Sequence, residues 1–250
     1  GYSAGKEVTT GTHNTLIGSL AGDAIDVGIA NVALGYGSLS TDDVGSHNVA
    51  LGYAALGTQN IATAANTYNT AVGSGAIGGL TTGIYNTAVG GLALDAVVTA
   101  NEVTAIGYQA ASSVTSGISQ VAVGAGALYS TTTGDLNTAL GYQAMYTNVD
   151  GDRSTAVGYQ ALYTQEPASN VDMYNVAVGH IAGYGLTTGT FNVAVGAGSL
   201  QAACTGNNNV SLGYNAMMSN TGGADNIAVG TALRSNVGGD ANVAIGTDAL

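Results

Sequence analysis

The stretch Asn-Thr-Ala-Leu-Gly-Tyr-Gln-Ala-Met (residues 137–145) contains the pattern that decides the fold. Close copies are Asn-Val-Ala-Leu-Gly-Tyr (residues 31–36 and 48–53) and Asn-Val-Ala-Val-Gly (residues 192–196). In each copy Asn and Ala alternate with β-branched residues or leucine, which is the period-two signature of a β-strand. The full consensus is G-x-x-N-x-A-x-G followed by x-x-A-L. Helical periodicity is absent, so the sequence predicts an all-β protein.

The glycine that closes each N-x-A-x-G copy, called the anchor glycine below, recurs at a nearly constant spacing. The spacing between neighbouring anchor glycines is 17 in most cases, 21 in two cases and 16 in one. A fixed period of this size predicts a solenoid in which equivalent residues stack on one another. The anchor glycines are Gly18, Gly35, Gly52, Gly73, Gly90, Gly107, Gly124, Gly141, Gly158, Gly179, Gly196, Gly213, Gly230 and Gly246.

The two longer spacings mark four-residue insertions, within residues 57–68 and 163–174. The second insertion holds the only proline, Pro167. We expect both to bulge from one corner of the coil, because an insertion inside a stacked strand would break the ladder above and below it. The prediction is one continuous β-solenoid of about 14 rungs over residues 1–250, uncapped at both ends. Since solenoids need atypical terminal repeats, we expect it to continue further or to stack end to end.

The alternation also predicts which residues share a face of the strand. Val193 and Val195 share one face, and the small residues Asn192, Ala194 and Gly196 share the other. A 17-residue rung offers only about three large apolar side chains, a thin core for a solitary coil. We therefore predict a parallel homotrimer whose Ala-rich faces pack around a common axis. A solitary three-sided helix of about 18 residues per turn is the main competing fold.

Three further local features follow from the repeat. The x-x-A-L tail, for example residues 159–162, predicts a second short strand in each rung. The glycine that stands three residues before most of the asparagines, such as Gly189, predicts a turn conformation that residues with a Cβ resist. The asparagines themselves, present four residues before eleven of the fourteen anchor glycines, predict amide ladders along the axis.

Composition excludes several classes of function. With 15 acidic and three basic residues the formal charge is −12, which disfavours binding to nucleic acid and to anionic lipids. No window approaches the roughly 18 uninterrupted apolar residues of a membrane-spanning helix, so membrane insertion is not expected. A hydrophobic share of 46%, including 14 tyrosines, argues against disorder. The single cysteine, Cys204, cannot form an intrachain disulfide.

The repeats at 31–36, 48–53 and 137–145 resemble the head repeats of trimeric autotransporter adhesins. They resemble even more closely the longer-period repeats of tail-fibre proteins of bacterial viruses. The resemblance covers essentially the whole chain, with a 17-residue spacing that is longer than that of the adhesin heads. It implies a left-handed parallel β-roll trimer, displayed on a virion tail or a bacterial cell surface. In both families the distal regions bind host-surface glycans or proteins.

Ten of the fifteen aromatic residues stand at two positions of the repeat. Six tyrosines directly follow an anchor glycine, and we expect them to stack on adjacent rungs. A second position, just before the asparagine, also accepts charged and small polar residues, which is typical of a solvent-facing turn. Exposed rings there suit stacking on sugars, so they are our candidates for surface recognition. The first set is Tyr36, Tyr53, Tyr108, Tyr142, Tyr159 and Tyr214, and the second is Tyr68, Tyr85, Tyr174 and Phe191.

Other chemistry is weakly represented, and we expect no enzyme, no metal site and no cofactor. His13 and His47 share one repeat position without nearby ligands at metal spacing. Residues 148–152 resemble a fragment of a calcium loop that lacks its closing carboxylate and is followed by Arg153. The Gly-x-x-x-Gly patterns belong to the repeat and have neither the base of a nucleophile elbow nor the lysine of a phosphate loop.

The leading functional hypothesis is a structural extracellular fibre segment, a shaft or head that presents or contributes to attachment to host surfaces or matrix. One alternative is an ice-binding or other surface-array solenoid, although its threonines vary with valine and isoleucine from rung to rung. Another is the subunit of a self-stacking extracellular filament. A left-handed helix acyltransferase is disfavoured, because the hexapeptide period of those enzymes does not divide 17.

Overall fold

The computed structural model of the chain describes residues 1–167, 169–202 and 204–249. In this part of the chain all regular structure is β, and no helix is present that could cross a membrane. The chain forms two compact units, residues 1–122 and 123–250. Each unit is a β-solenoid of parallel strands. That the two units form one continuous solenoid stays a prediction from the sequence.

The strands are short and recur once per rung, with two additional pairs at the insertions. Unit 1 contains β1 (Thr15–Ile17), β2 (Val32–Leu34), β3 (Gly45–Ser46), β4 (Val49–Leu51), β5 (Ala65–Asn66), β6 (Thr70–Val72), β7 (Thr87–Val89) and β8 (Thr104–Ile106). At the boundary lies β9 (Val121–Val123). Unit 2 contains β10 (Thr138–Leu140), β11 (Gly151–Asp152), β12 (Thr155–Val157), β13 (Val171–Asp172), β14 (Val176–Val178), β15 (Val193–Val195), β16 (Val210–Leu212), β17 (Ile227–Val229) and β18 (Val243–Ile245).

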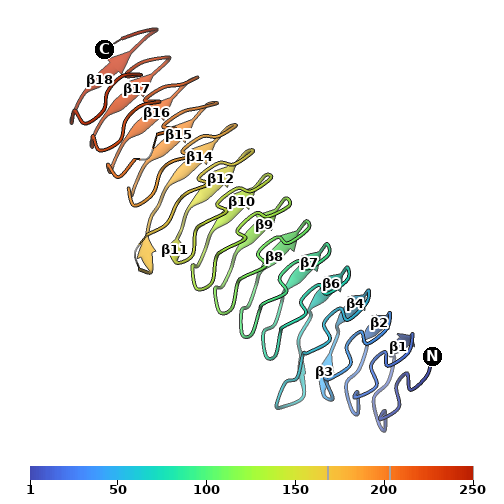
Figure 1. Cartoon of the computed structure of the whole chain (residues 1–250). Coiled ribbons are helices and arrows are strands. Elements are labelled where there is room, and N and C mark those ends of the chain that lie inside the picture. Colours follow the sequence, from blue (N-terminus) through green and yellow to red (C-terminus); the bar gives the residue numbers. More distant parts are fainter. Residues whose placement is uncertain (168, 203, 250) are drawn as a thin grey trace. The chain divides into compact units, whose positions relative to one another are not determined.

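The three-residue strands pair in parallel with equivalent residues in register (Figure 1). In unit 1, Ala33 of β2 lies beside Ala50 of β4, and in unit 2 Ala177 of β14 lies beside Ala194 of β15. The partners in each pair are separated by one period of the repeat, so the predicted rung length is confirmed. The backbone N–H at the start of a three-residue strand donates to the carbonyl at the asparagine position of the next rung, for example Val193 to Asn209 and Thr138 to Ser154, at 2.8 and 2.9 Å.

The insertions leave this ladder unbroken, as expected. The register continues across them at the longer spacing, with Val49 beside Thr70 and Thr155 beside Val176. Each insertion also adds a two-stranded parallel sheet, β3 with β5 and β11 with β13. These pairs lie apart from the row of three-residue strands (Figure 1). Ala168, inside the second insertion, and the final Leu250 lie outside the described residues.

The grouping of residues into two strand faces is confirmed, but the expectation that the Ala-rich face packs against other chains is wrong. Ala194 and Asn192 are almost completely buried inside their own coil, whereas Val195 is 37% exposed and Val193 is partly exposed. The Ala-rich face therefore cannot be the surface on which three chains meet. The physical reason is the narrow coil. Its interior also holds the Ala and Leu of the tail, such as Ala161 and Leu162, and only small residues fit opposite them.

The core asparagines form ladders, but mostly through the backbone. Asn192 Oδ1 accepts the backbone N–H of Asn209 at 2.9 Å, and Asn192 Nδ2 donates to the carbonyl of Gly206 at 2.9 Å. A direct amide-to-amide bond joins Asn209 Nδ2 to Asn192 Oδ1 at 3.1 Å. The buried carboxamide of Asn192 thus satisfies its own polar atoms and two backbone groups of the next rung.

The predicted second strand in the x-x-A-L tail does not form. Residues 159–164 are turns, with a φ of 50° at both Gln160 and Leu162. The tail still bonds to both neighbouring rungs, because Gln160 N–H donates to the Tyr142 carbonyl at 2.9 Å and Leu162 N–H donates to the Ala182 carbonyl at 3.0 Å. Alternating left-handed residues keep the chain compact enough to complete a coil within the short repeat.

The glycine that precedes the asparagine serves a different purpose from the one predicted. Gly189 does not lie in the left-handed region. A Cβ on it would instead touch the Gly206 carbonyl and lie 3.0 Å from Asn192 Nδ2. The requirement there is close approach between rungs. The anchor glycines combine both demands: Gly179 has φ of 138°, and a Cβ on it would lie 2.7 Å from the Gly196 carbonyl oxygen.

We predict that Gly179→Ala lowers the free energy of unfolding by about 3 kcal/mol or more, since it adds both backbone strain and a clash with the next rung. The matched control is Gly222→Ala, where φ is ordinary and a Cβ meets nothing within 4 Å. That variant should stay within about 1 kcal/mol of the parent. Urea unfolding followed by circular dichroism measures both; equal losses in the two variants would contradict the assigned role of the anchor glycine.

Candidate functional site

Each unit carries the same surface arrangement beside its insertion, which we call the aromatic column. In unit 1 the column is His47, Tyr68 and Tyr85, with ring centroids 5.0 and 5.9 Å apart. In unit 2 the guanidinium carbon of Arg153 lies 5.8 Å from the Tyr174 ring centroid, and the rings of Tyr174 and Phe191 lie 5.2 Å apart. A cation or imidazole thus precedes two aromatic rings in both units.

The column exists because of where its residues stand in the rung. Each one directly precedes a position of the core asparagine column, and each adopts positive φ, for example 49° at Tyr68 and 57° at Phe191. This conformation turns the side chain outward while the following residue points inward. The four aromatic residues proposed from the sequence are accordingly exposed, at 43 to 53%. The structure brings them together in two pairs, one in each unit.

Polar groups hold the first ring of each column in place. Asn66 Nδ2 donates to the Tyr68 hydroxyl oxygen at 3.4 Å, and the Tyr174 hydroxyl donates to Asp172 at 3.3 Å. Asp172 also forms an ion pair with Arg153, so in unit 2 one carboxylate links the cation and the phenol. The short strands β5 and β13, created by the insertions, supply Asn66 and Asp172. The insertion therefore shapes the column.

Stacking determines which ring surfaces are open. Tyr68 has aromatic neighbours on both sides, whereas among the described residues Tyr85 and Phe191 each have a ring neighbour on one side only. The next rung places Glu102 after Tyr85 and Asn208 after Phe191 in the same column position. Each column thus ends in an open aromatic surface beside a polar side chain, an arrangement suited to an amphipathic ring such as a sugar.

A buried glutamine supports each insertion from inside. Gln59 and Gln165 are fully buried, and each accepts a hydrogen bond from the core asparagine ten residues later, at 2.8 Å from Asn69 and 3.0 Å from Asn175. In the rung before the insertion, Gln59 meets Asp42 and Gln165 meets Asn148. The two units therefore build the same internal support, with a carboxylate in one and an amide in the other.

The carboxylate of Asp42 is the electrostatic difference between the two insertions. Asp42 is 1% exposed, and burial raises the pKa of its carboxyl above the usual value of 3.8. Hydrogen bonds from Gln59 and from the backbone of Gly45 oppose that rise without cancelling it. Since the folded pKa exceeds the unfolded one, the stability that this group contributes is complete below the unfolded pKa and is lost as pH rises through the folded pKa.

We predict that Asp42→Asn makes the protein more stable than the parent at neutral pH, because it removes a buried charge and reproduces Asn148. The advantage should shrink as pH falls through the raised pKa of the folded parent carboxyl toward the usual value of 3.8. Thermal unfolding at a series of pH values measures it. Asp43→Asn, which removes an exposed carboxylate in the next position, is the control and should show no such trend. A constant difference between Asp42→Asn and parent at every pH would refute the prediction.

The other residues singled out in the sequence are surface or turn residues. The stacking expected of tyrosines after the anchor glycines is confirmed for Tyr36 with Tyr53, at 5.6 Å, and for Tyr142 with Tyr159, at 5.5 Å. In the calcium-like segment, Asn148 Oδ1 accepts the Gly151 N–H at 3.1 Å and closes a turn. Within the described residues, no group of three His, Cys, Asp or Glu side chains is placed to bind a metal ion.

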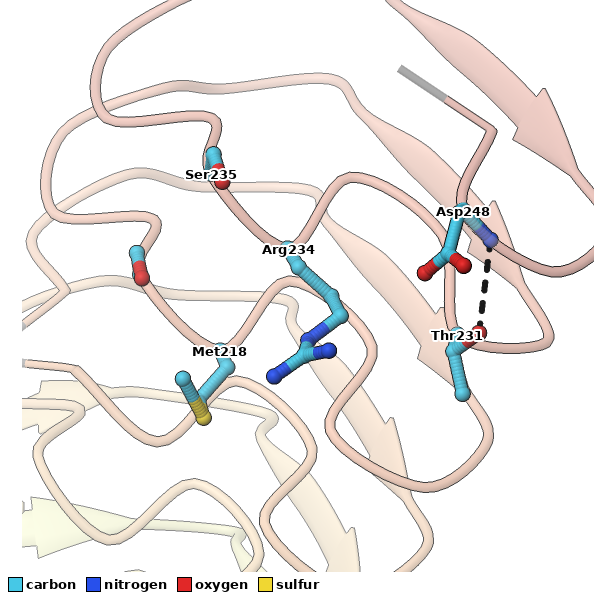
Figure 2. A pocket seen from close by; sticks show the side chains of 6 residues that line it. Met218, Thr231, Arg234, Ser235 and Asp248 are labelled. Atoms are coloured by element: carbon cyan, nitrogen blue, oxygen red, sulfur yellow. Dashed lines mark hydrogen bonds between the residues drawn. The ribbon is translucent and has the colours of Figure 1, made fainter.

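A cleft of about 460 Å³ lies near the end of unit 2 (Figure 2). Met218, Ser219, Thr231, Arg234, Ser235 and Asp248 line it. The Asp248 N–H donates to the Thr231 hydroxyl at 3.4 Å, and the exposed Arg234 side chain extends along the cleft. These residues deviate from the repeat, so periodicity gave no signal for the cleft. It has no counterpart to the polar support of the aromatic columns.

No protein-family model, no curated protein and no solved structure matches this chain. The likeness to adhesin heads and tail fibres therefore remains an expectation based on the repeat motif.

Proposed function

We propose that this chain is a structural segment of an extracellular fibre, of the tail-fibre or adhesin type, on a virion tail or a bacterial cell surface. The β-solenoid fold is compatible with a structural repeat protein. The observation that carries the proposal is the outward strand face. Each rung leaves large apolar side chains on this face, and the stacked rungs align them in a row. In a fibre of several chains in register, the rows of neighbouring chains pack against one another.

The outward strand face consists of the first and third residues of the three-residue strands. In the described chain these positions hold only threonine, valine, leucine and isoleucine. Ile17 is 55% exposed, Leu34 47%, and Leu140 45%. A contiguous apolar surface of this kind marks an interaction site in soluble proteins. In a chain with net charge −12, this is a surface on which copies can meet without repulsion.

A second and a third copy of the same chain are the partners that fit this face. Parallel copies have the same rung spacing of about 4.8 Å, so side chains of one copy meet those of another at every rung. The predicted homotrimer is therefore retained with a different interface: the Val, Leu and Ile rows pack around the common axis, and the Ala columns stay inside each coil. Acidic side chains and aromatic columns then remain outside.

We predict that Leu140→Lys with Val178→Lys converts the trimer to monomers, because buried lysines would repel one another across the axis. The matched control is Leu136→Lys with Val171→Lys. Those side chains are equally exposed, at 45 and 38%, but lie outside the outward strand face. Native mass spectrometry or sedimentation equilibrium measures the oligomeric state, and circular dichroism checks folding.

A monomeric parent chain would overturn the trimer proposal, and so would dissociation by the control pair. If a monomeric parent also showed thermal hysteresis, the ice-binding alternative would gain support. The outward strand face includes neighbouring threonines at Thr70, Thr87 and Thr104, which such an activity would use.

We propose further that the aromatic columns contribute to attachment by binding surface glycans. Tyr85 and Phe191 offer the open ring surfaces, and Tyr68 and Tyr174 hold them in place from the rung before. The proposal rests on their exposure and on the adjacent polar residues Glu102 and Asn208. The two units repeat the arrangement.

We predict that Tyr85→Ala with Phe191→Ala weakens binding on a glycan array about fivefold or more, since an aromatic contact of this type contributes about 1 kcal/mol or more. The control pair is Tyr53→Ala with Tyr214→Ala. Its rings are more exposed, at 62 and 66%, but they follow anchor glycines and lie outside the columns. Equal losses for both pairs, or binding that neither pair changes, would exclude the columns as the glycan site.

A further inference from the structure

Unit 2 contains a continuous stack of four tyrosines, which we call the tyrosine ladder: Tyr129, Tyr146, Tyr163 and Tyr184. Neighbouring ring centroids are 4.9, 5.3 and 5.0 Å apart, and neighbouring planes differ by only 3 to 4°. The side chains are partly exposed, so small oxidants in solution can reach them. Neither the aromatic columns nor the outward strand face includes these residues.

The ladder comes from one position of the repeat, five residues after the anchor glycine. Its first three members follow one another at the regular period, and the last comes after the longer spacing because the second insertion lies between them. The stack continues across the insertion without loss of geometry. Unit 1 has no aromatic residue at this position, where it holds Asp23, Ser40, Gly57, Gly78, Asp95 and Ser112.

The ladder is the closest and most parallel set of phenols in the described chain. The pair Tyr142 and Tyr159, in two of the same rungs, is 5.5 Å apart and tilted by 14°, and Tyr68 and Tyr85 are 5.9 Å apart and tilted by 17°. Ladder phenols are therefore held side by side before any reaction. Pre-positioning of this kind favours coupling between neighbours over coupling between molecules.

We propose that the tyrosine ladder is a site of oxidative cross-linking, in which hydrogen peroxide and a haem peroxidase join tyrosines of adjacent rungs as dityrosine. Each of two phenols loses one electron and one proton, and gives a phenoxyl radical. A carbon–carbon bond forms between the ring carbons next to the two hydroxyls, and the two ring hydrogens move to the oxygens. Overall, two phenols and one hydrogen peroxide give one dityrosine and two waters.

The protonation state of Tyr163 fits this step. Burial, together with the neighbouring tyrosines Tyr184 and Tyr146, raises the pKa of Tyr163 above 10.0. Tyr163 is therefore neutral at physiological pH, and water receives the proton that leaves with its electron.

Such a bond has a direct consequence for a solenoid. Solenoids are held by contacts between nearest rungs, so they can lose structure rung by rung. A dityrosine between neighbouring ladder residues closes a loop of one rung and ties two rungs covalently, as a disulfide does in other extracellular proteins. With a single cysteine, this chain has no intrachain disulfide with which to do so.

The test treats the dilute protein with horseradish peroxidase and hydrogen peroxide, and then measures dityrosine fluorescence and maps cross-linked peptides by mass spectrometry. We expect links between Tyr129 and Tyr146, Tyr146 and Tyr163, or Tyr163 and Tyr184. On a denaturing gel the product should run as a single chain. The oxidised protein should also unfold at a higher urea concentration than the untreated one.

Tyr146→Phe with Tyr163→Phe keeps the stacked rings but removes every adjacent phenol pair of the ladder, so these cross-links and the gain in stability should be lost. Tyr142→Phe with Tyr159→Phe changes the same two rungs and should leave the ladder links intact. The proposal fails if the ladder variant yields as much intrachain dityrosine as the parent. It also fails if the mapped links join other tyrosines or only different chains.

Discussion

The structure depends on the hydrogen bonds that each core asparagine makes to the next rung. In Asn192 the side-chain oxygen accepts the backbone N–H of Asn209, and the side-chain nitrogen donates to the carbonyl of Gly206. No regular strand lies at this corner of the coil to bond these backbone groups, so the buried amide forms the hydrogen bonds instead. A residue that replaces the asparagine still donates its backbone N–H to the asparagine of the preceding rung. Ser154 N–H, for example, donates to Asn137 Oδ1 at 3.0 Å.

These bonds permit a backbone that would be unfavourable in isolation. Residues such as Leu162 and Tyr174 adopt positive φ, which costs on the order of 1 kcal/mol or more for a residue with a Cβ. The cost recurs in each rung, and the bonds that each rung makes to its neighbours offset it. A single rung would therefore not be stable in this conformation. The conformation is stable only in stacked rungs, so substitution of the anchor glycines or core asparagines destabilises it.

The same tight coil determines what remains outside for function. Because the strand residue that faces the interior is alanine in nearly every rung, the larger residues of each strand are left on the surface, where they form a face suited to copies of the chain. Corners with positive φ carry the residue before each asparagine outward, and in each unit two such residues, at and just after the insertion, are aromatic. Stacking, which holds the coil together, also aligns these rings and the tyrosine ladder.

The sequence by itself determined the rung length, the in-register pairing and the places of both insertions, because a constant repeat period forces equivalent residues to lie beside one another. It also predicted that Tyr68, Tyr85, Tyr174 and Phe191 would be exposed, from the variety of residues their position tolerates. It could not determine which strand face points inward, since period-two alternation looks the same from either side. Only the packing of Ala194 against the rest of its coil decided that. Nor could it show the positive φ angles in the x-x-A-L tail, because leucine and glutamine have no preference for that conformation. The tyrosine ladder was also not predicted, because its rings meet only when the rungs are stacked.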